Sequence, residues 1–289
     1  MIEVRDLRKQ YGEFVAVSGS TFTVDRGEVF GIIGPNGAGK TTTLKMLAGL
    51  LEPTAGEATV AGYEAGDPEM RRQLGFLPEE SPLYEEMTPV SYLRFFADLY
   101  DVPREVADDR LHGTLDRLDL DHRDRPLGDM SKGMKRKVAI ARSLINDPDV
   151  LVYDEPGSGL DPLTTNYIIE FTRELGEEGK TVVFSAHNLF HVESICDRVA
   201  VMNGGDIVAK GDLDRLQAEH GHTEYHVYTT VEVDRSVREN GRYRRVVDTM
   251  EAVERTREAA EAAGGSVVDI RTEESNLEEV FLNLAEREE

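Results

Sequence analysis

The amino-acid sequence predicts an α/β protein whose main part is built on a parallel sheet. A short apolar run at 29–33 passes through a glycine-rich loop into a segment with leucines at helical spacing, the pattern of strand, loop and helix. Two more apolar runs, at 150–156 and 181–187, are typical of strands buried on both faces of a parallel sheet. Ahead of them, residues 2–24 alternate short apolar runs with turns, which predicts two or three antiparallel strands.

Length and composition limit the classes of protein that fit. The chain has 289 residues, enough for one large domain or two with a proper buried core. Its 56 acidic and 33 basic residues give a formal charge of −23, which argues against nucleic acid as a partner. The only cysteine, Cys196, cannot form an internal disulfide, which fits a reducing cytoplasm. No apolar run approaches the length of a membrane span, so we expect a soluble protein.

The loop after the first apolar run matches the phosphate-binding pattern GxxxxGK[ST]. Its glycines let the backbone turn N–H groups inward, and the N-terminus of the following helix adds partial positive charge where phosphate oxygens sit. Lys40 is placed to reach the terminal phosphates, and the Thr41 hydroxyl to ligate Mg²⁺. A glycine-rich turn that only caps a helix is the alternative, but the flanking strand and helix favour nucleotide binding. The residues assigned to the nucleotide are Gly34, Pro35, Asn36, Gly37, Ala38, Gly39, Lys40, Thr41 and Thr42.

One aromatic residue stands ahead of this loop. Tyr11 lies beside Gly12 on an expected strand edge. From that position alone, its ring is equally suited to stack on an adenine or to cover the surface of the sheet.

Residues 51–146 predict short strands followed by a helical insertion. The insertion begins at Thr88, which has the features of an N-cap, with Pro89 at the first helical position. Its last helix has Ser131 as its N-cap and is stopped at Asp147. The expected elements are strands within 52–63 and at 74–77, and helical segments at 68–73, at 90–100, from 111 to about 121, and within 129–146.

Acidic residues stand at the carboxyl end of the run at 150–156. Ligands bind at that end of a parallel strand, so Asp154 and Glu155 are expected near the Mg²⁺ and the terminal phosphate. The alternative is a turn in which the acidic residues have no role in binding or catalysis. His187 follows the next buried strand at the same edge of the sheet, where a role at the phosphate is favoured over a structural one.

The pattern changes after about residue 211. A helix at 188–196 and a hairpin with its turn at 203–205 precede the change, and beyond it the sequence predicts a small α/β appendage without a catalytic constellation. We therefore expect two domains, 1–215 and 222–289. The elements expected in the second are strands at 224–233 and 265–270, a helix rich in Ala and Glu between them, and a last helix whose capping box is Ser275 and Glu278.

In their order along the chain, these motifs resemble the ATP-binding subunit of an ABC transporter, from residue 2 to about 211. The resemblance implies a P-loop NTPase fold of the ABC type, with an antiparallel β subdomain, a helical subdomain at about 86–135 and the C-terminal α/β appendage. Five motifs at these spacings are highly specific. They are GPNGAGKTT at 34–42, the signature segment MSKGM at 130–134, LVYDEP at 151–156, SGLD at 158–161 and SAHN at 185–188.

By this resemblance, two copies of the chain sandwich two ATP molecules head to tail. Glu155 polarises the attacking water and His187 contacts the γ-phosphate, so both are catalytic residues, while Asp154 holds Mg²⁺ through water. The other implied positions are Tyr11 on the adenine, Ser131, Lys132 and Gly133 on the nucleotide of the other copy, and Asp161 at the dimer interface.

Two segments depart from the family pattern. The usual signature is LSGGQ, whereas here Lys132 replaces the first glycine and Met134 the glutamine. Lys132 either adds charge at the phosphate or points to solvent. Glu79 stands where the family has a glutamine, and its carboxylate can still ligate Mg²⁺ but adds negative charge beside the phosphates.

The segments SKGMK, LPEE and SNLEEVFLNL are similar to the exporter-like ABC-2 subgroup. That similarity implies a Mg²⁺-dependent ATPase that drives export through an integral membrane permease on a separate chain. The ATPase would lie in the cytoplasm, held at the inner face of the cell membrane by the permease. A soluble ABC ATPase without a permease, in cluster assembly, repair or translation, is the alternative.

Overall fold

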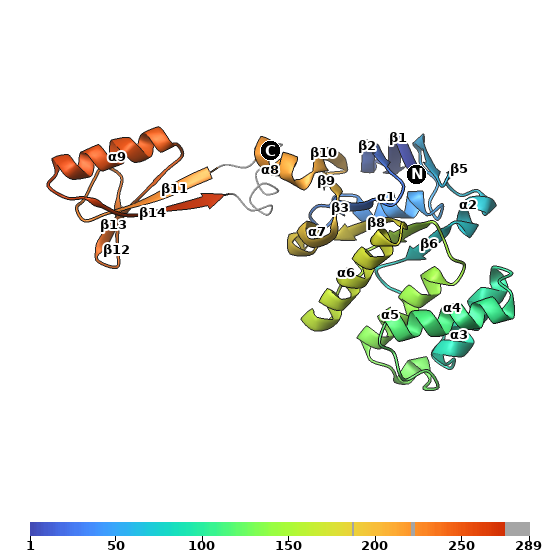
Figure 1. Cartoon of the computed structure of the whole chain (residues 1–289). Coiled ribbons are helices and arrows are strands. Elements are labelled where there is room, and N and C mark those ends of the chain that lie inside the picture. Colours follow the sequence, from blue (N-terminus) through green and yellow to red (C-terminus); the bar gives the residue numbers. More distant parts are fainter. Residues whose placement is uncertain (187, 221–222, 275–289) are drawn as a thin grey trace. The chain divides into compact units, whose positions relative to one another are not determined.

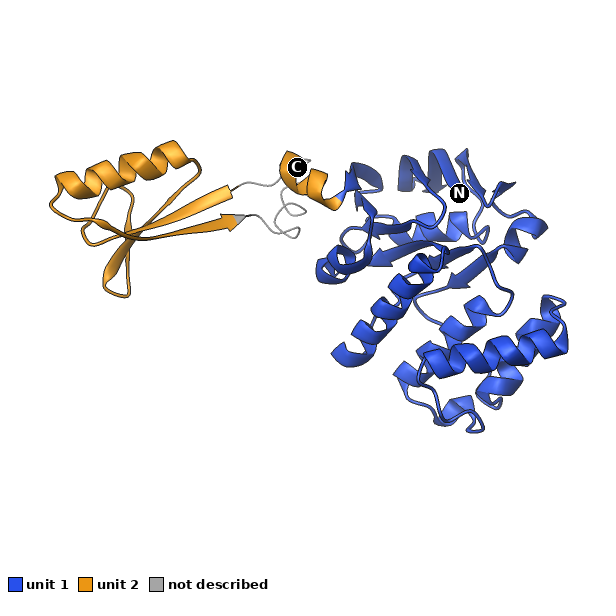
Figure 2. Ribbon diagram, viewed as in Figure 1, with its two compact units in different colours: residues 1–212 blue, residues 213–289 orange. Residues whose placement is uncertain are grey.

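The computed structural model describes residues 1–186, 188–220 and 223–274. They form two compact units, residues 1–212 and 213–289, which Figure 2 colours separately. The helix expected from Ser275 lies outside the described residues. Among the described helices, none is both long and apolar enough to cross a membrane.

A six-stranded sheet forms the centre of the first unit (Figure 1), with its strands in the order β10-β9-β3-β8-β7-β6. All neighbouring strands run parallel except β10, which pairs antiparallel with β9 at one edge. Every residue of β3, β7 and β8 is buried, as the continuous apolar runs predict. The strands are β3 (Val29–Ile33), β6 (Leu74–Leu77), β7 (Val150–Tyr153), β8 (Thr181–Ala186), β9 (Arg198–Asn203) and β10 (Asp206–Asp212).

A second sheet, antiparallel and in the order β2-β1-β4-β5, confirms the strands expected at the N-terminus. Helix α1 contacts both sheets, touching β2 and β4 on one side and β7 and β8 on the other. One hydrophobic core therefore includes side chains of both sheets and of the helix that follows the phosphate loop. The elements are β1 (Ile2–Tyr11), β2 (Phe14–Val24), β4 (Ala55–Val60), β5 (Tyr63–Glu64) and α1 (Lys40–Leu47).

Helices α6 (Pro162–Glu177) and α7 (Leu189–Ile195) pack on the parallel sheet. Gly31 marks the face that α7 covers, because a Cβ there would lie 2.8 Å from Cys196 Sγ and 3.4 Å from Val192. Its neighbours along β3 alternate to the opposite face and join the core around α1. The parallel sheet is thus covered on both faces.

The helical insertion confirms the expected N-caps. The Thr88 side chain accepts a hydrogen bond from Ser91 N–H, and Ser131 accepts one from Met134 N–H. Helix α1, which follows the phosphate loop, is shorter than its leucine pattern predicts. It ends at Leu47, and Leu50 is 61% exposed. The insertion comprises α3 (Pro89–Leu99), α4 (Arg104–Arg117), the 3₁₀ turn η1 (Leu127–Asp129) and α5 (Lys132–Leu144), while the short helix α2 (Pro68–Arg72) precedes it and contacts β5 and β6.

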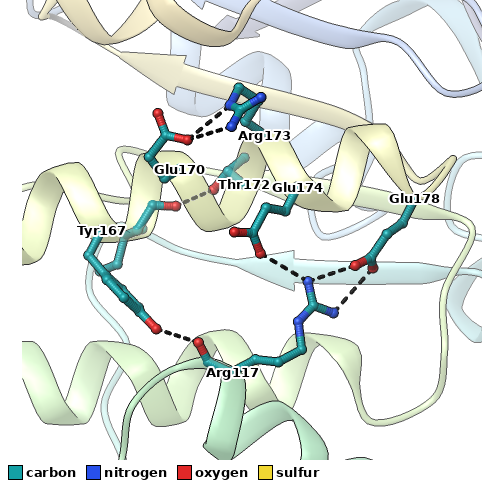
Figure 3. Close-up of polar contacts among 8 residues, drawn as sticks. Arg117, Tyr167, Glu170, Thr172, Arg173, Glu174 and Glu178 are labelled. Atoms are coloured by element: carbon teal, nitrogen blue, oxygen red, sulfur yellow. Dashed lines mark hydrogen bonds and ion pairs between the residues drawn. The ribbon is translucent and has the colours of Figure 1, made fainter.

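Arg117, at the end of α4, ties the insertion to α6 (Figure 3). Its guanidinium lies 3.3 Å from Glu174 and 2.8 Å from Glu178, and it covers the ring of Phe171 at 4.9 Å. The Tyr167 hydroxyl donates to the Arg117 carbonyl oxygen. These contacts join residues that are 50 or more positions apart in sequence.

The second unit contains an antiparallel sheet in the order β12-β13-β11-β14, with α9 packed on β11 and β13. The sequence analysis missed the hairpin β12–β13. Its turn is Asn240–Gly241, with both residues at positive φ, a strong hairpin signal that the consecutive arginines of β13 obscure. The elements are α8 (Leu213–His220), β11 (Thr223–Thr229), β12 (Val237–Glu239), β13 (Arg242–Val247), α9 (Met250–Ala262) and β14 (Val267–Glu274).

We expect Arg117→Ala to lower the free energy of unfolding by about 1 kcal/mol, because its ion pairs are half-exposed and water screens them. Urea unfolding should show a larger loss in dilute buffer than at high salt. Arg173→Ala is the matched control on α6, since among the described residues Arg173 forms its ion pairs with Glu170 and Glu177 of the same helix, and its loss should be smaller. Equal losses for the two variants would contradict a link between α4 and α6.

Candidate functional site

A pocket of about 600 Å³ opens at the carboxyl ends of the parallel strands. Most of the predicted phosphate loop lines it, and three other segments complete it: the start of β2, the loop after β6 and the turn after β7. The lining residues are Phe14, Ala16, Asn36, Gly37, Ala38, Gly39, Lys40, Thr41, Thr42, Glu79, Glu155 and Ser158.

Close packing explains why two positions of the phosphate loop must be glycine. A Cβ on Gly34 would lie 2.3 Å from the Met202 carbonyl oxygen, so no larger residue fits beside β9. Gly39 has a φ of +100°, and its Cβ would lie 2.5 Å from the Ala16 carbonyl oxygen of β2. The loop is therefore held between both sheets.

The Lys40 side chain folds back over this loop. Its ammonium group donates to the carbonyl oxygens of Gly34 at 2.7 Å and Pro35 at 3.3 Å, and lies 3.8 Å from Glu155 Oε1. Lys40 lines the pocket and is only 7% exposed, so water screens its charge little there. A cation in this place attracts phosphate oxygens.

Asp154 is buried at the end of β7, where two hydroxyl groups hold one of its oxygens. Thr41 Oγ1 donates to Asp154 Oδ1 at 3.1 Å, and Ser185 Oγ donates to the same atom at 2.6 Å. Among the described residues, no basic side chain is paired with this carboxylate, which is 2% exposed. A buried negative charge beside a threonine hydroxyl is a donor set that suits Mg²⁺.

The described residues contain no group of three or more His, Cys, Asp or Glu side chains that could hold a metal ion by themselves.

Glu155 has an unusual backbone conformation, with a φ of +45°. Its N–H donates to Ser185 Oγ at 2.9 Å, and its carbonyl oxygen accepts a hydrogen bond from Arg136 Nη2 at 2.9 Å. A left-handed conformation is strained for a residue with a side chain, and such residues cluster at functional sites. The conformation places the carboxylate of Glu155 on the pocket wall, 12% exposed.

The hairpin between β1 and β2 brings a second aromatic residue to the pocket. Phe14 pairs directly opposite Tyr11, lines the pocket and is 64% exposed. Tyr11 is not among the lining residues, and Lys9 Nζ lies 5.3 Å from the centre of its ring. Sequence reasoning named only Tyr11, although a two-residue turn would have placed Phe14 opposite it.

Glu79 lines the pocket, and its Oε1 accepts a hydrogen bond from Ser158 Oγ at 3.2 Å. Lys132 is exposed in the single chain, and its ammonium group lies beside Gly159, so close that a Cβ on Gly159 would be 2.1 Å from it.

Ser131, Gly133 and Asp161 do not line the pocket of their own chain. Ser131 caps α5 and is exposed, and a Cβ on Gly133 would lie 3.1 Å from Thr164. Asp161 caps α6, and the hydrogen bonds from the Thr164 hydroxyl and N–H hold the pKa of its carboxyl below the usual value. His187 lies outside the described residues.

Comparison with known proteins confirms the resemblance. The ABC transporter family profile matches residues 17–158. The ABC transporter ATP-binding protein NatA of Bacillus subtilis is 41% identical over 205 residues, which cover 70% of this chain and 83% of NatA. The Nod factor export ATP-binding protein I of Ralstonia nicotianae is 39% identical over 219 residues, covering 75% and 68%.

Solved structures agree in fold. An ATP-binding subunit of an ABC transporter superposes with a TM-score of 0.70 at 36% identity, covering 76% of this chain and 92% of that one. The cassette MJ0796, a dimer in a post-hydrolysis state with ADP and phosphate, gives 0.67 at 26% identity, covering 74% and 99%. The fold is thus the ABC cassette, with its antiparallel subdomain and a C-terminal antiparallel sheet. This chain belongs to the ABC transporter family, as one of its ATP-binding and ATP-hydrolysing proteins.

Proposed function

We propose that this chain is the ATPase subunit of an ABC-2 type exporter and drives an integral membrane permease carried on a separate chain. The observation that carries the proposal is that the phosphate loop and Glu155 line one pocket, while Asp154 accepts a hydrogen bond from Thr41 of the same loop. Relatives named for Nod factor export and for linearmycin resistance support export as the direction. The permease would hold the chain at the inner, cytoplasmic face of the cell membrane.

The phosphate loop is proposed to bind the triphosphate of ATP. Lys40, Thr41 and Thr42 at the start of α1 line the pocket, where the N–H groups of a first helical turn can bind phosphate. Lys40 would exchange its carbonyl partners for phosphate oxygens. Thr41 and Asp154 would hold Mg²⁺, with Glu79 as a further oxygen donor on the wall. When bound, Mg²⁺ neutralises charge on the phosphate oxygens.

Glu155 is the proposed catalytic base. Its carboxylate would orient a water molecule and accept its proton while the water oxygen bonds to the γ-phosphorus and the bond to the ADP oxygen breaks. The products are ADP and inorganic phosphate. His187 is proposed to contact the γ-phosphate.

A second copy of the chain is proposed to complete each site. The N-terminus of α5 offers N–H donors and partial positive charge at Ser131, Lys132 and Gly133, and none of these residues lines its own chain's pocket. Each would therefore serve the nucleotide of the partner, with Asp161 at the interface. The dimeric cassette MJ0796 supports this arrangement.

We propose that the ATPase lies within residues 1–215 and that residues 222–289 form an accessory domain. The formal charge of −23 supports a partner other than nucleic acid.

Purification from membranes tests the proposed partner. We expect a tagged full-length chain, expressed in its own host and extracted with mild detergent, to bring down a multi-span membrane protein that raises its ATP turnover. Recovery without such a protein, and no stimulation by a candidate permease, would favour the soluble ATPase instead.

Glu155→Gln should retain ATP binding and lose turnover by about a hundredfold or more, because the amide keeps the shape of the side chain but cannot accept the proton. Phosphate release and ATP titration measure the two quantities. Glu174→Gln is the control, since Glu174 lies on α6 and pairs with Arg117. Unchanged turnover in Glu155→Gln would remove Glu155 from this role.

Phe14→Ala should weaken ATP binding by about fivefold to a hundredfold, the range expected when one base loses an aromatic stacking partner. Binding of inorganic tripolyphosphate should not change, because that probe has no base. Tyr11→Ala, measured alongside, shows which ring of the hairpin carries the adenine, and Phe95→Ala on α3 is an exposed aromatic control. Equal losses for ATP and tripolyphosphate in Phe14→Ala would contradict base stacking.

A further inference from the structure

Arg136 is a buried cation whose role the sequence analysis did not recognise. It lies on α5 between two lysines, is 7% exposed, and donates hydrogen bonds to six oxygen atoms. None of these oxygens carries a charge. They are the carbonyl oxygens of Pro78 (2.6 Å), Glu79 (3.0 Å), Asp154 (3.1 Å), Glu155 (2.9 Å) and Pro156 (2.8 Å), and the hydroxyl of Ser81 (3.2 Å).

These acceptors belong to two loops that both reach the nucleotide pocket. One follows β6 and carries Glu79, and the other follows β7 and carries Glu155. The planar guanidinium has donors in fixed directions, so it sets the orientation of the peptide groups in both loops at once. Arg136 therefore fixes the two pocket walls relative to α5.

Glu155 depends on this support more than its neighbours do. Its left-handed backbone is strained, so hydrogen bonds on both sides of the residue must hold it. Ser185 accepts from its N–H, while its carbonyl oxygen accepts from Arg136 at 2.9 Å and from Ser158 N–H at 3.0 Å. Without Arg136, this carbonyl group would keep only the hydrogen bond from Ser158, and the strained residue would be held less firmly with its carboxylate toward the pocket.

Burial lowers the pKa of the Arg136 guanidinium to about 10, because desolvation disfavours the charged form. The group is still protonated near neutral pH and keeps its full set of donors. Lysine at this position would keep the charge but have only three donors on a single atom, which cannot reach both loops in the same way.

We propose that Arg136 is a positioning residue for ATP hydrolysis: by bridging the loops after β6 and β7, it holds Glu155 in the conformation that aims its carboxylate at the terminal phosphate. This rests on the proposed role of Glu155 as the base. Arg136 does not line the nucleotide pocket, so it acts on the chemical step and leaves ATP binding unchanged.

The test compares Arg136→Lys with Arg142→Lys in the full chain. Arg142 is the matched control because it lies on the same helix and donates to Tyr92 Oη at 3.2 Å and to the Phe76 carbonyl oxygen at 3.3 Å, without touching either pocket loop. Three quantities are measured: the urea midpoint, the Kd for the ATP analogue AMP-PNP, and kcat at saturating ATP. Arg136→Gln, which is neutral and keeps two donors, is the second variant if the lysine variant does not fold.

We expect both lysine variants to lose stability and to bind AMP-PNP as the wild type does. Only Arg136→Lys should lose kcat, by about tenfold to a hundredfold, because a small displacement of a reacting group has effects of this size. Equal kcat values in the two variants, or a kcat loss matched by weaker AMP-PNP binding, would overturn the proposal. Failure of both Arg136 variants to fold would also overturn it, since the residue would then serve folding alone.

The same series separates this inference from the proposed function. If the wild type does not hydrolyse ATP, or if Glu155→Gln retains turnover, the proposed function fails. If both behave as proposed and Arg136→Lys retains wild-type kcat, only the role of Arg136 fails.

Discussion

A buried carboxylate held by two hydroxyl groups joins the strands on which this site depends. Thr41, at the start of α1, and Ser185, near the end of β8, both donate to Asp154 at the end of β7. The three hydrogen bond partners come from segments far apart in sequence that a parallel sheet brings to one edge. Because no described basic side chain forms an ion pair with Asp154, its charge favours a bound cation and, with it, a phosphate.

The rest of the first unit keeps this edge in place. Helix α1 is packed between two sheets, and the phosphate loop before it is pressed against Met202 on β9 and Ala16 on β2. Helix α5 supports the opposite wall through Arg136, and the same helix begins at Ser131, the residue proposed to meet the partner's nucleotide. A displacement of α5 would therefore change the position of Glu155. In the proposed dimer, this would couple the nucleotide bound at Ser131 of one chain to the catalytic base of the same chain.

Local patterns allowed the sequence to predict the phosphate loop, Asp154, Glu155 and the N-cap Ser131, because each is defined by residues next to one another. Features that depend on distant contacts were missed. Arg136 stands in a run of basic residues typical of a solvated helix face, and only the tertiary fold shows that loop carbonyl groups surround it. Phe14 was missed because its place depends on the register of a hairpin, and strand β13 because its arginines break the apolar alternation. The strained backbone of Glu155 has no sequence signal.

The most direct test of this account is an experimental structure of the full chain carrying Glu155→Gln, bound to ATP and Mg²⁺. The account predicts two copies, with each triphosphate lying between Lys40 and Thr41 of one chain and Ser131 of the partner subunit, and with Mg²⁺ beside Asp154. A single copy with Ser131 far from any nucleotide, or a triphosphate bound away from the phosphate loop, would contradict it.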